Sequence, residues 1–318
     1  MNILILGGAG FLGSNLVRRC LRDPENRITV VDSLDLRLRS MKENLAEVWA
    51  SIDFIQGDIR DEELLYKVVE NQQIIFNCAA QTSHPLSFSA PLFDAEVNCL
   101  GNLKLLEAVR LRSKNSILVY PSSSTVIGRA TGDILDETHG EKPLDIYSAH
   151  KGVAEKYYRI YNQVYDIKTI VLRFPNLYGP YGKGFPEFGV VNYFIYLASE
   201  DEDITVYGNG EQTRNVLFVE DAVEAMYESA FNDRLIGELY FVAHDEHLTV
   251  MEIAQGIVTV WGKGRVVSAD WPDLRRRIEV EQVRISSARF RESTRWTPRF
   301  SLQEGLIKTK QIMERTSG

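Results

Sequence analysis

The stretch Tyr147-Ser148-Ala149-His150-Lys151 carries a phenol and an ammonium four residues apart. In a helix this spacing places both groups on one face, one turn apart. A nearby cation favours the ionised form of a phenol, whose ordinary pKa is about 10, so the pair could supply a base. The same spacing also arises by chance on an amphipathic helix whose lysine lies in solvent. The interpretation as a base therefore depends on the rest of the chain.

A glycine-rich turn near the N-terminus fits a dinucleotide site. Gly8-x-Gly10-x-x-Gly13 and Gly7-x-x-Gly10-x-x-Gly13 both follow a short apolar run and precede an amphipathic stretch. Glycines allow the tight turn and let the backbone approach a pyrophosphate, while the helix N-terminus faces the phosphates. Because the turn joins a predicted strand to a predicted helix, we interpret Gly7, Gly10 and Gly13 as cofactor-binding residues.

Asp32 ends the next predicted strand, near the distance expected for a ribose-binding acid. Its carboxylate can accept both ribose hydroxyls of NAD and would repel the extra phosphate of NADP. Arg37 and Arg39 lie just beyond and in principle favour NADP, but Asp32 occupies the closer position. We therefore expect NAD as the cofactor.

Strands and helices alternate through the first half of the chain. Apolar runs at 2–6, 28–31, 52–55, 74–78, 117–120 and 169–172 predict strands, and helical patterns lie between them at 14–21, 62–70, 95–111 and 147–161. This alternation indicates an α/β fold with a Rossmann-type, doubly wound parallel sheet. The pattern becomes less regular after Pro175. We expect an NAD-binding domain over residues 1–175 and a smaller C-terminal α/β lobe over 176–318 that binds substrate, with some segments returning to the large domain.

The composition is that of an ordinary globular protein, with 318 residues, 44% hydrophobic and 25% charged residues, and a net charge of -8. The acidic balance argues against a nucleic-acid partner, and no apolar run is long enough for a membrane span. Cys20, Cys78 and Cys99 show neither paired nor metal-ligand spacing, so we expect reduced thiols and no metal site. With no signal sequence at the N-terminus, a cytoplasmic location is expected.

Further motifs follow one another along essentially the whole chain: Gly57-Asp58-Ile59, Ala79-Ala80, Val97-Asn98, Ser122-Ser123-Ser124-Thr125-Val126-Ile127-Gly128, residues 173–180 and residues 212–216. With the glycine turn and the Tyr147-x-x-x-Lys151 pair, they make the chain resemble the extended short-chain dehydrogenase/reductases of the nucleotide-sugar epimerase and dehydratase group. The resemblance implies NAD as cofactor and a nucleoside diphosphate sugar as substrate. It also implies that a sugar hydroxyl is oxidised by hydride transfer to the cofactor.

The resemblance implies a role for residues in each motif. Ser123, Tyr147 and Lys151 are the implied catalytic group, in which Ser123 orients the sugar 4-hydroxyl and Lys151 also binds the nicotinamide ribose. The implied cofactor cleft contains Phe11 and Leu12 along the pyrophosphate, Asp58 and Ile59 beside the adenine, and Ala79, Ala80, Asn98, Phe174 and Pro175. Implied substrate contacts are Ser123, Ser124, Asn176, Arg214, Arg276 and Val283. The register at Arg276 is ambiguous by one residue, because it lies within three consecutive arginines.

The serine-rich motif bears on the type of reaction. The 4,6-dehydratases of the group carry an Asp-Glu pair where this chain has Ser124 and Thr125, and the glucuronate decarboxylases typically keep a Glu at the second position. The pattern here is similar to that of the 4-epimerases. We therefore expect epimerisation at C4 through a transient 4-keto sugar, with a UDP-sugar favoured. Val283 stands where some members have a bulky Tyr, which would admit an N-acetylhexosamine as well as the UDP-glucose/UDP-galactose pair.

Alternatives on the same fold are a 2-epimerase, a decarboxylase, a 4,6-dehydratase and a 4-keto reductase. A non-catalytic NAD-sensing protein is an alternative from another class, because a fold alone does not fix a function. In the group, the helices expected at 95–111 and 147–161 pair across a two-fold axis as a four-helix bundle. Both carry apolar or aromatic residues on more than one face here. The resemblance therefore implies a homodimer.

Overall fold

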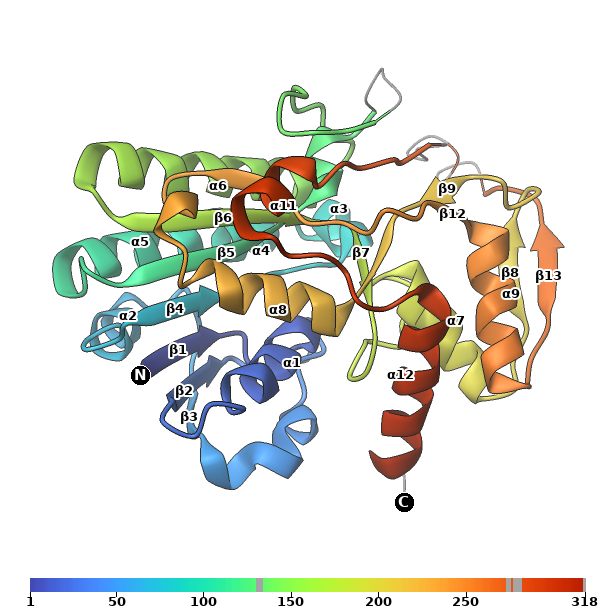
Figure 1. Cartoon of the computed structure of the whole chain (residues 1–318), viewed down its shortest axis with the longest axis horizontal. Helices are drawn as coiled ribbons and strands as arrows, with labels where there is room; N and C mark the ends of the chain where they lie inside the picture. The colour runs from blue at the N-terminus through green and yellow to red at the C-terminus, as the bar shows by residue number, and fades with distance from the viewer. Residues whose placement is uncertain (130–133, 273–275, 277–281, 317–318) are drawn as a thin grey trace.

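The computed structural model describes residues 1–318 except 130–133, 273–275, 277–281 and 317–318. Its centre is a seven-stranded parallel sheet in the order β11-β6-β5-β4-β1-β2-β3 (Figure 1). The strands are β1 (Asn2–Leu6), β2 (Arg27–Asp32), β3 (Asp53–Gln56), β4 (Ile74–Asn77), β5 (Ile117–Ser123), β6 (Lys168–Phe174) and β11 (Leu239–Phe241). The predicted α/β fold with a Rossmann-type sheet is confirmed.

Helices cover both faces of this sheet. Successive residues of each strand point to opposite faces, so each strand contributes side chains to two apolar cores. Ile3 and Ile5 of β1 belong to one apolar core, and Leu4 and Leu6 belong to the other. The first core includes residues of α1 (Phe11–Cys20) and α8 (Val219–Ser229). The second includes residues of α2 (Glu62–Val68), α5 (Gly101–Arg112) and α6 (Ile146–Tyr165). Burial on both faces explains why these strands read as continuous apolar runs.

The second half of the chain forms a set of smaller elements beside the sheet, on the right of Figure 1. Helix α7 (Val190–Ser199) was not predicted from the sequence, and helices α9 (Val250–Trp261) and α12 (Leu302–Thr316) accompany it. Three short strand pairs complete this region: β7 (Asn176–Tyr178) with β10 (Val216–Phe218), β8 (Ile204–Tyr207) with β13 (Val266–Ala269), and β9 (Thr213–Arg214) with β12 (Leu248–Thr249).

The remaining short elements connect these parts. They are η1 (Lys42–Ser51), α3 (His84–Ser89), α4 (Pro91–Ala95), η2 (Glu96–Leu100), η3 (Ser124–Ile127), η4 (Asp233–Leu235) and α11 (Ala288–Thr294). Within the described ranges, no helix is long and apolar enough to cross a membrane.

Two segments of the second half return to the large sheet. Strand β11 pairs with β6, and helix α8 packs against α1. Arg19 of α1 donates two hydrogen bonds of 2.6 Å to Glu224 of α8. The carboxylate of Asp221, buried in α8, accepts hydrogen bonds from the backbone N–H groups of Arg299 and Phe300 at 3.1 and 3.2 Å. These contacts fix the chain that leads into α12.

Candidate active site

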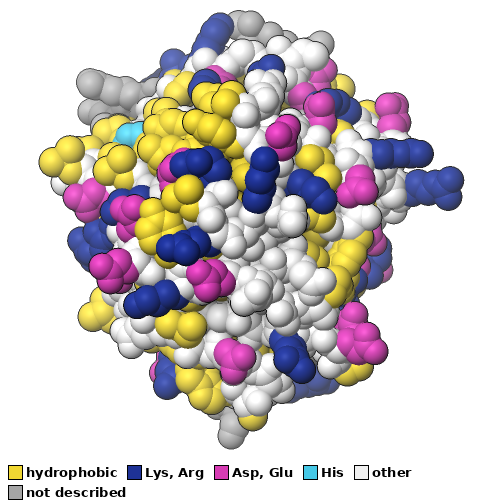
Figure 2. All heavy atoms as spheres, turned by 90° about the vertical axis from the view of Figure 1, so that its left-hand side faces the viewer, with side chains coloured by type: hydrophobic (Ala, Val, Ile, Leu, Met, Phe, Trp, Pro, Cys, Tyr) yellow, Lys and Arg dark blue, Asp and Glu magenta, His cyan; other side chains and the backbone are white. Residues whose placement is uncertain are grey.

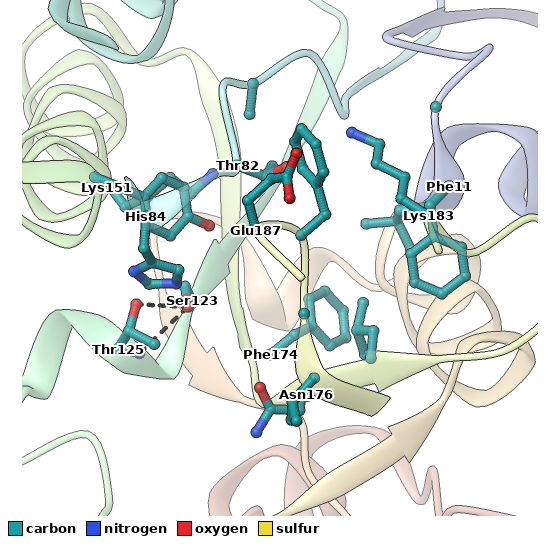
Figure 3. Close-up of a pocket in the computed structure, with 18 of the residues that line it drawn as sticks. Phe11, Thr82, His84, Ser123, Thr125, Lys151, Phe174, Asn176, Lys183 and Glu187 are labelled. Atoms are coloured by element: carbon teal, nitrogen blue, oxygen red, sulfur yellow. Dashed lines mark hydrogen bonds between the residues drawn. The ribbon is translucent and has the colours of Figure 1, made fainter. Parts of the chain in front are cut away.

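A cavity of about 910 Å³ lies at the carboxyl ends of the central strands and extends to the smaller elements of the second half. The strand order reverses between β1 and β4, and open α/β sheets bind ligands at such a switch point. Figure 3 shows Lys183 and Phe11 on one side of this cavity and His84, Ser123 and Thr125 on the other.

The glycine turn forms a backbone cradle at one end of the cavity. Gly7 has a φ of 73°, and a Cβ placed there would lie 2.6 Å from the backbone nitrogen of Ala79. A Cβ at Gly13 would lie 2.1 Å from the carbonyl oxygen of Gly7, so only glycine fits. Gly10, Phe11, Leu12 and Gly13 all line the cavity, and helix α1 begins at Phe11. The positive end of this helix therefore faces the space where a phosphate would lie.

Asp32 lies at the same end of the cavity and is only 3% exposed. Its two carboxylate oxygens accept hydrogen bonds from the backbone N–H groups of Ala9 and Leu34, both at 2.9 Å. Burial raises the pKa of this carboxyl, while those two N–H groups and the charge of Lys183 act in the opposite direction. Asp58 and Ile59 line the cavity as well.

The loop after β4 forms another wall of this end. Ala79 and Ala80 line the cavity, whereas Asn98 is fully buried behind them. The Asn98 amide donates to the Gln81 carbonyl at 2.9 Å and accepts from the Gln81 N–H at 3.1 Å. Asn98 therefore holds the loop in place from behind. Phe174 and Pro175 line the cavity at the end of β6.

These residues fit a dinucleotide. Within the described part of the chain, Ser122 Oγ and Asn77 Oδ1 are buried without a hydrogen-bond partner, and both residues line the cavity. A buried polar atom left unpaired costs free energy, so a polar ligand at this place would stabilise the site. Together with the glycine cradle and Asp32, this arrangement matches the cofactor deduced from the sequence.

Tyr147 and Lys151 lie one turn apart on α6, and both are buried. Ser123 lines the same cavity and lowers the pKa of the Tyr147 phenol. The Lys151 ammonium donates to the carbonyl oxygen of Pro121 at 2.7 Å and lies 4.0 Å from the centroid of the Tyr120 ring. The three implied catalytic side chains therefore lie along one wall of the cavity.

The pKa of Tyr147 departs from the direction expected from the sequence. Burial raises the pKa of Tyr147 well above 10, Asp145 raises it further, and Ser123 lowers it only in part. Burial also lowers the pKa of Lys151 to about 7. The sequence predicts that Lys151 lowers the pKa of Tyr147. In the protein without NAD this lowering is not found, because burial has the largest effect on the pKa of both side chains.

The implied substrate residues fall into two sets. Ser124, Asn176, Arg214 and Val283 line the cavity. Burial lowers the pKa of Arg214 to about 10, and its guanidinium donates to the carbonyl oxygen of Thr213 at 2.8 Å. Arg276 is exposed and is not among the residues that line the cavity. The adjacent arginines at 275 and 277 lie outside the described residues, so the role of this arginine stays a prediction.

Several cavity residues were not identified from the sequence. Thr82 and His84 follow the Ala79-Ala80 motif, and Lys183 and Glu187 lie in the loop before α7. Burial lowers the pKa of Lys183 to about 8, and its ammonium donates to the carbonyl oxygen of Leu38 across the cavity mouth. Lys183 lies in a glycine-rich stretch, and a basic residue within such a stretch is the signal in the sequence that points to it.

The fold and the cavity together define a dinucleotide-binding α/β fold of the short-chain dehydrogenase type. A family model described as the NAD dependent epimerase/dehydratase family matches residues 3–242, so the chain belongs to this family. NAD as the cofactor is thereby confirmed. No group of three or more His, Cys, Asp or Glu side chains arranged to hold a metal ion occurs among the described residues.

Relatives with different reactions are similar to this chain. It is 30% identical over 320 residues to the UDP-glucose 4-epimerase of Mycolicibacterium smegmatis, covering 100% of both chains. It is 28% identical to the dTDP-D-glucose 4,6-dehydratase of Homo sapiens, covering 96% of this chain and 88% of that protein. The solved structure of the Thermus thermophilus UDP-glucose 4-epimerase in complex with NAD superposes with a TM-score of 0.86 at 29% identity, covering 100% and 99% of the two chains. Membership of the family therefore does not distinguish epimerisation from dehydration, and the residues of the site have to be considered.

Proposed function

We propose that this protein epimerises a nucleoside diphosphate sugar at C4 through a transient 4-keto sugar, with UDP-hexoses or UDP-N-acetylhexosamines as substrates. The observation that carries the proposal is the row of hydroxyls at Ser123, Ser124 and Thr125 beside Tyr147. Thr125 is hydrogen-bonded to Ser123 and Ser148, so this position has a hydroxyl where elimination would need a carboxylic acid. Oxidation and re-reduction of one carbinol needs only a base, a hydroxyl relay and a hydride carrier.

The proposed roles of the chain follow from the geometry. The glycine turn and the N-terminus of α1 hold the pyrophosphate, Asp32 binds the adenosine ribose, and Lys151 binds the nicotinamide ribose. When bound, NAD supplies the hydride acceptor and donor. Tyr147 takes the proton of the sugar 4-hydroxyl through Ser123. Because burial raises the pKa of Tyr147, its ionisation gains from the positive charge that the oxidised nicotinamide places nearby.

The sugar nucleotide is proposed to bind on the side of the smaller elements. Arg214 is a largely buried cation at the cavity wall, and Asn176 lies nearby on β7. Both suit an anionic diphosphate, since a buried guanidinium binds phosphate oxygens strongly. The Val283 side chain lines the cavity and leaves more room than a tyrosine would. This supports acceptance of a 2-acetamido group.

A second candidate is elimination or decarboxylation on the same keto sugar. Glu187 projects into the cavity from the loop before α7, on a different element from the serine-rich motif (Figure 3). A carboxylate there could act as an acid or base at carbons next to C4. The products distinguish the two reactions.

The test is to incubate the NAD-loaded protein with UDP-glucose or UDP-N-acetylglucosamine and follow the sugar by NMR. The expected result is an inverted C4 centre with no net consumption of NAD. Tyr147→Phe should lower kcat by roughly 10²–10⁴-fold, whereas Tyr165→Phe at the exposed end of the same helix should not. A 4-keto-6-deoxy product would favour elimination, and carbon dioxide release would favour decarboxylation. Full activity of Tyr147→Phe would refute the catalytic assignment.

We also propose that two copies associate through α5 and α6. Large apolar side chains are exposed on or beside these helices: Leu100 at 51%, Leu111 at 52%, Ile160 at 48% and Val164 at 62%. Figure 2, which faces the left-hand side of Figure 1, shows hydrophobic side chains gathered towards one edge of this face. A homodimer would bury such side chains, whereas a monomer leaves them in water.

We further propose a cytoplasmic location. The three cysteines are free thiols. Burial raises the pKa of Cys78 to about 12 and that of Cys99 to about 11, so both stay protonated and unreactive. A chain with buried, unpaired thiols is typical of a reducing compartment.

A further inference from the structure

The loop between β7 and α7 (residues 179–189) reaches from the smaller elements to the cofactor end of the cavity. The buried side-chain amide of Asn15, on α1, donates to the carbonyl oxygen of Pro180 at 3.0 Å. The next residue, Tyr181, donates from its hydroxyl to a carboxylate oxygen of Glu47 in η1 at 3.2 Å. The loop is therefore held against two elements of the large domain, and its position relative to the glycine turn is fixed.

Lys183 is the basic residue that this loop brings into the cavity. Its side chain is half-buried and lines the cavity, and its ammonium donates to the carbonyl oxygen of Leu38 in the loop after β2. The ammonium also lies 4.3 Å from the centroid of the Phe188 ring. Figure 3 shows Lys183 on the same side of the cavity as Phe11, the first residue of α1. Within the described ranges, the bond to Leu38 uses one of the three N–H donors of the ammonium, so two are available to a ligand.

The Lys183 ammonium belongs to a cluster that includes the glycine turn. Burial lowers the pKa of Lys183 to about 8, and the charge of Asp32 acts in the opposite direction. Because the interaction of two charges weakens with distance, this effect places the ammonium near the carboxylate. Asp32 Oδ2 in turn accepts the backbone N–H of Ala9, inside the glycine turn, at 2.9 Å. The ammonium, the carboxylate and the turn therefore lie together at the cofactor end of the cavity.

The diphosphate is the anionic group that NAD presents to this cluster. The adenosine ribose offers uncharged hydroxyls, which the Asp32 carboxylate can accept. The same carboxylate repels the diphosphate next to that ribose, so a cation close to both lowers the free energy of binding. Lysine commonly supplies such a charge to phosphate groups. We propose that Lys183 is a further cofactor-binding residue, which donates to the diphosphate of NAD and thereby links the loop before α7 to the bound cofactor. This inference requires NAD binding but not the proposed epimerisation.

The diphosphate of a sugar nucleotide is the other anion that the cavity is proposed to hold. Arg214, the cation proposed for that group, lies on β9 among the smaller elements. Lys183 instead contacts Leu38 and the charge of Asp32, both in the large domain. We therefore assign Lys183 to the cofactor, and the experiment compares the two diphosphates.

The first measurement is the rate at which NAD leaves the full-length protein. The protein is loaded with isotope-labelled NAD, and an excess of unlabelled NAD is then added. Lys183→Met should raise the dissociation rate constant roughly 10-fold or more, because a charged hydrogen bond is lost. Lys263→Met removes an exposed lysine just after α9 and should leave the rate unchanged. An unchanged rate in Lys183→Met would overturn the proposal.

The second measurement identifies the group that Lys183 contacts. The affinities of the NAD-free, full-length chain for ADP, adenosine and UDP are compared by titration. Lys183→Met should weaken the binding of ADP roughly 10-fold and change the affinities for adenosine and UDP less than about two-fold. Retained adenosine binding would show that the site is folded.

Two results of this titration would contradict the assignment. An equal loss for adenosine and ADP would mean that Lys183 only fixes the loop through Leu38, and would overturn the proposal. A loss for UDP rather than ADP would place the contact on the sugar nucleotide, and would overturn it as well. Neither measurement involves turnover, so both are independent of the test of the proposed function.

Discussion

Replacing Lys151 with methionine should abolish activity and, at neutral pH, stabilise the folded protein without NAD. The lysine is 3% exposed, and burial lowers its pKa from 10.5 to about 7. Folding therefore brings a charged group into a site that favours the neutral form. Methionine has a similar length and no charge, so it fills the same space without the cost of desolvation.

The size of the effect follows from three contributions. The drop in pKa corresponds to roughly 5 kcal/mol of unfavourable free energy for the charged folded form at or below pH 7. Loss of the hydrogen bond to the Pro121 carbonyl costs about 1–3 kcal/mol. Loss of the cation–π contact with Tyr120 costs about 1 kcal/mol. The variant should thus gain roughly 1–3 kcal/mol at neutral pH.

The pH dependence of the gain has a definite sign. Between pH 7 and 10.5 the unfolded lysine holds a proton that the folded lysine has lost, so the wild-type protein becomes more stable as pH rises, by about 1.4 kcal/mol per pH unit. Below pH 7 both states hold the proton, and the advantage of the variant is constant and maximal. It should shrink above pH 7 and vanish near pH ~9.

Urea unfolding of NAD-free protein, followed by tryptophan fluorescence at several values from pH 6 to 9.5, measures this difference. NAD must be absent because a ligand that binds only the folded state raises the apparent stability. A variant that is less stable than the wild type at pH 6 would refute the reasoning. So would an advantage that does not change with pH.

Three further predictions concern other parts of the molecule. Gly13→Ala should abolish NAD binding, measured as dinucleotide released on denaturation, whereas Gly140→Ala, whose added Cβ meets nothing within 4 Å, should not. Asp221→Ala should lower the free energy of unfolding by roughly 2–4 kcal/mol in urea, because two backbone N–H groups lose their buried acceptor. Val164→Glu should convert the proposed dimer to a monomer by light scattering, and a dimer of unchanged mass would contradict the proposed interface.

The parts predicted well from the sequence are those governed by local rules. Strands buried on both faces must be apolar throughout, so β1 or β5 could be located from a run of a few residues. The glycine turn could be interpreted because its spacing reflects a backbone approach, and the structure shows the reason in the 2.1 Å contact that a Cβ at Gly13 would make. A motif whose spacing has a steric cause can therefore be interpreted from the sequence alone.

The parts that were missed depend on tertiary contacts. Helix α7 has the sequence VVNYFIYLAS, a mostly apolar run that the sequence alone does not distinguish from a buried strand. The helix expected at 95–111 is present, but its first part is the π-helical turn η2, which the sequence did not predict and which contains Asn98, the residue that holds the loop after β4. His84 begins the short helix α3 and Lys183 lies in a loop, and only the folded chain shows that both line the cavity.

The pairing of β11 with β6 has a consequence for synthesis on the ribosome. Until Leu239–Phe241 has emerged, the edge of β6 lacks its neighbour and the face covered by α8 is exposed to water. At a translation rate of about 5–20 residues per second, this interval lasts on the order of several seconds after residue 174 leaves the exit tunnel. During this interval the nascent chain exposes an apolar sheet face and an unpaired strand edge, both of which favour aggregation. We therefore expect chaperones to bind the nascent chain most strongly at this stage.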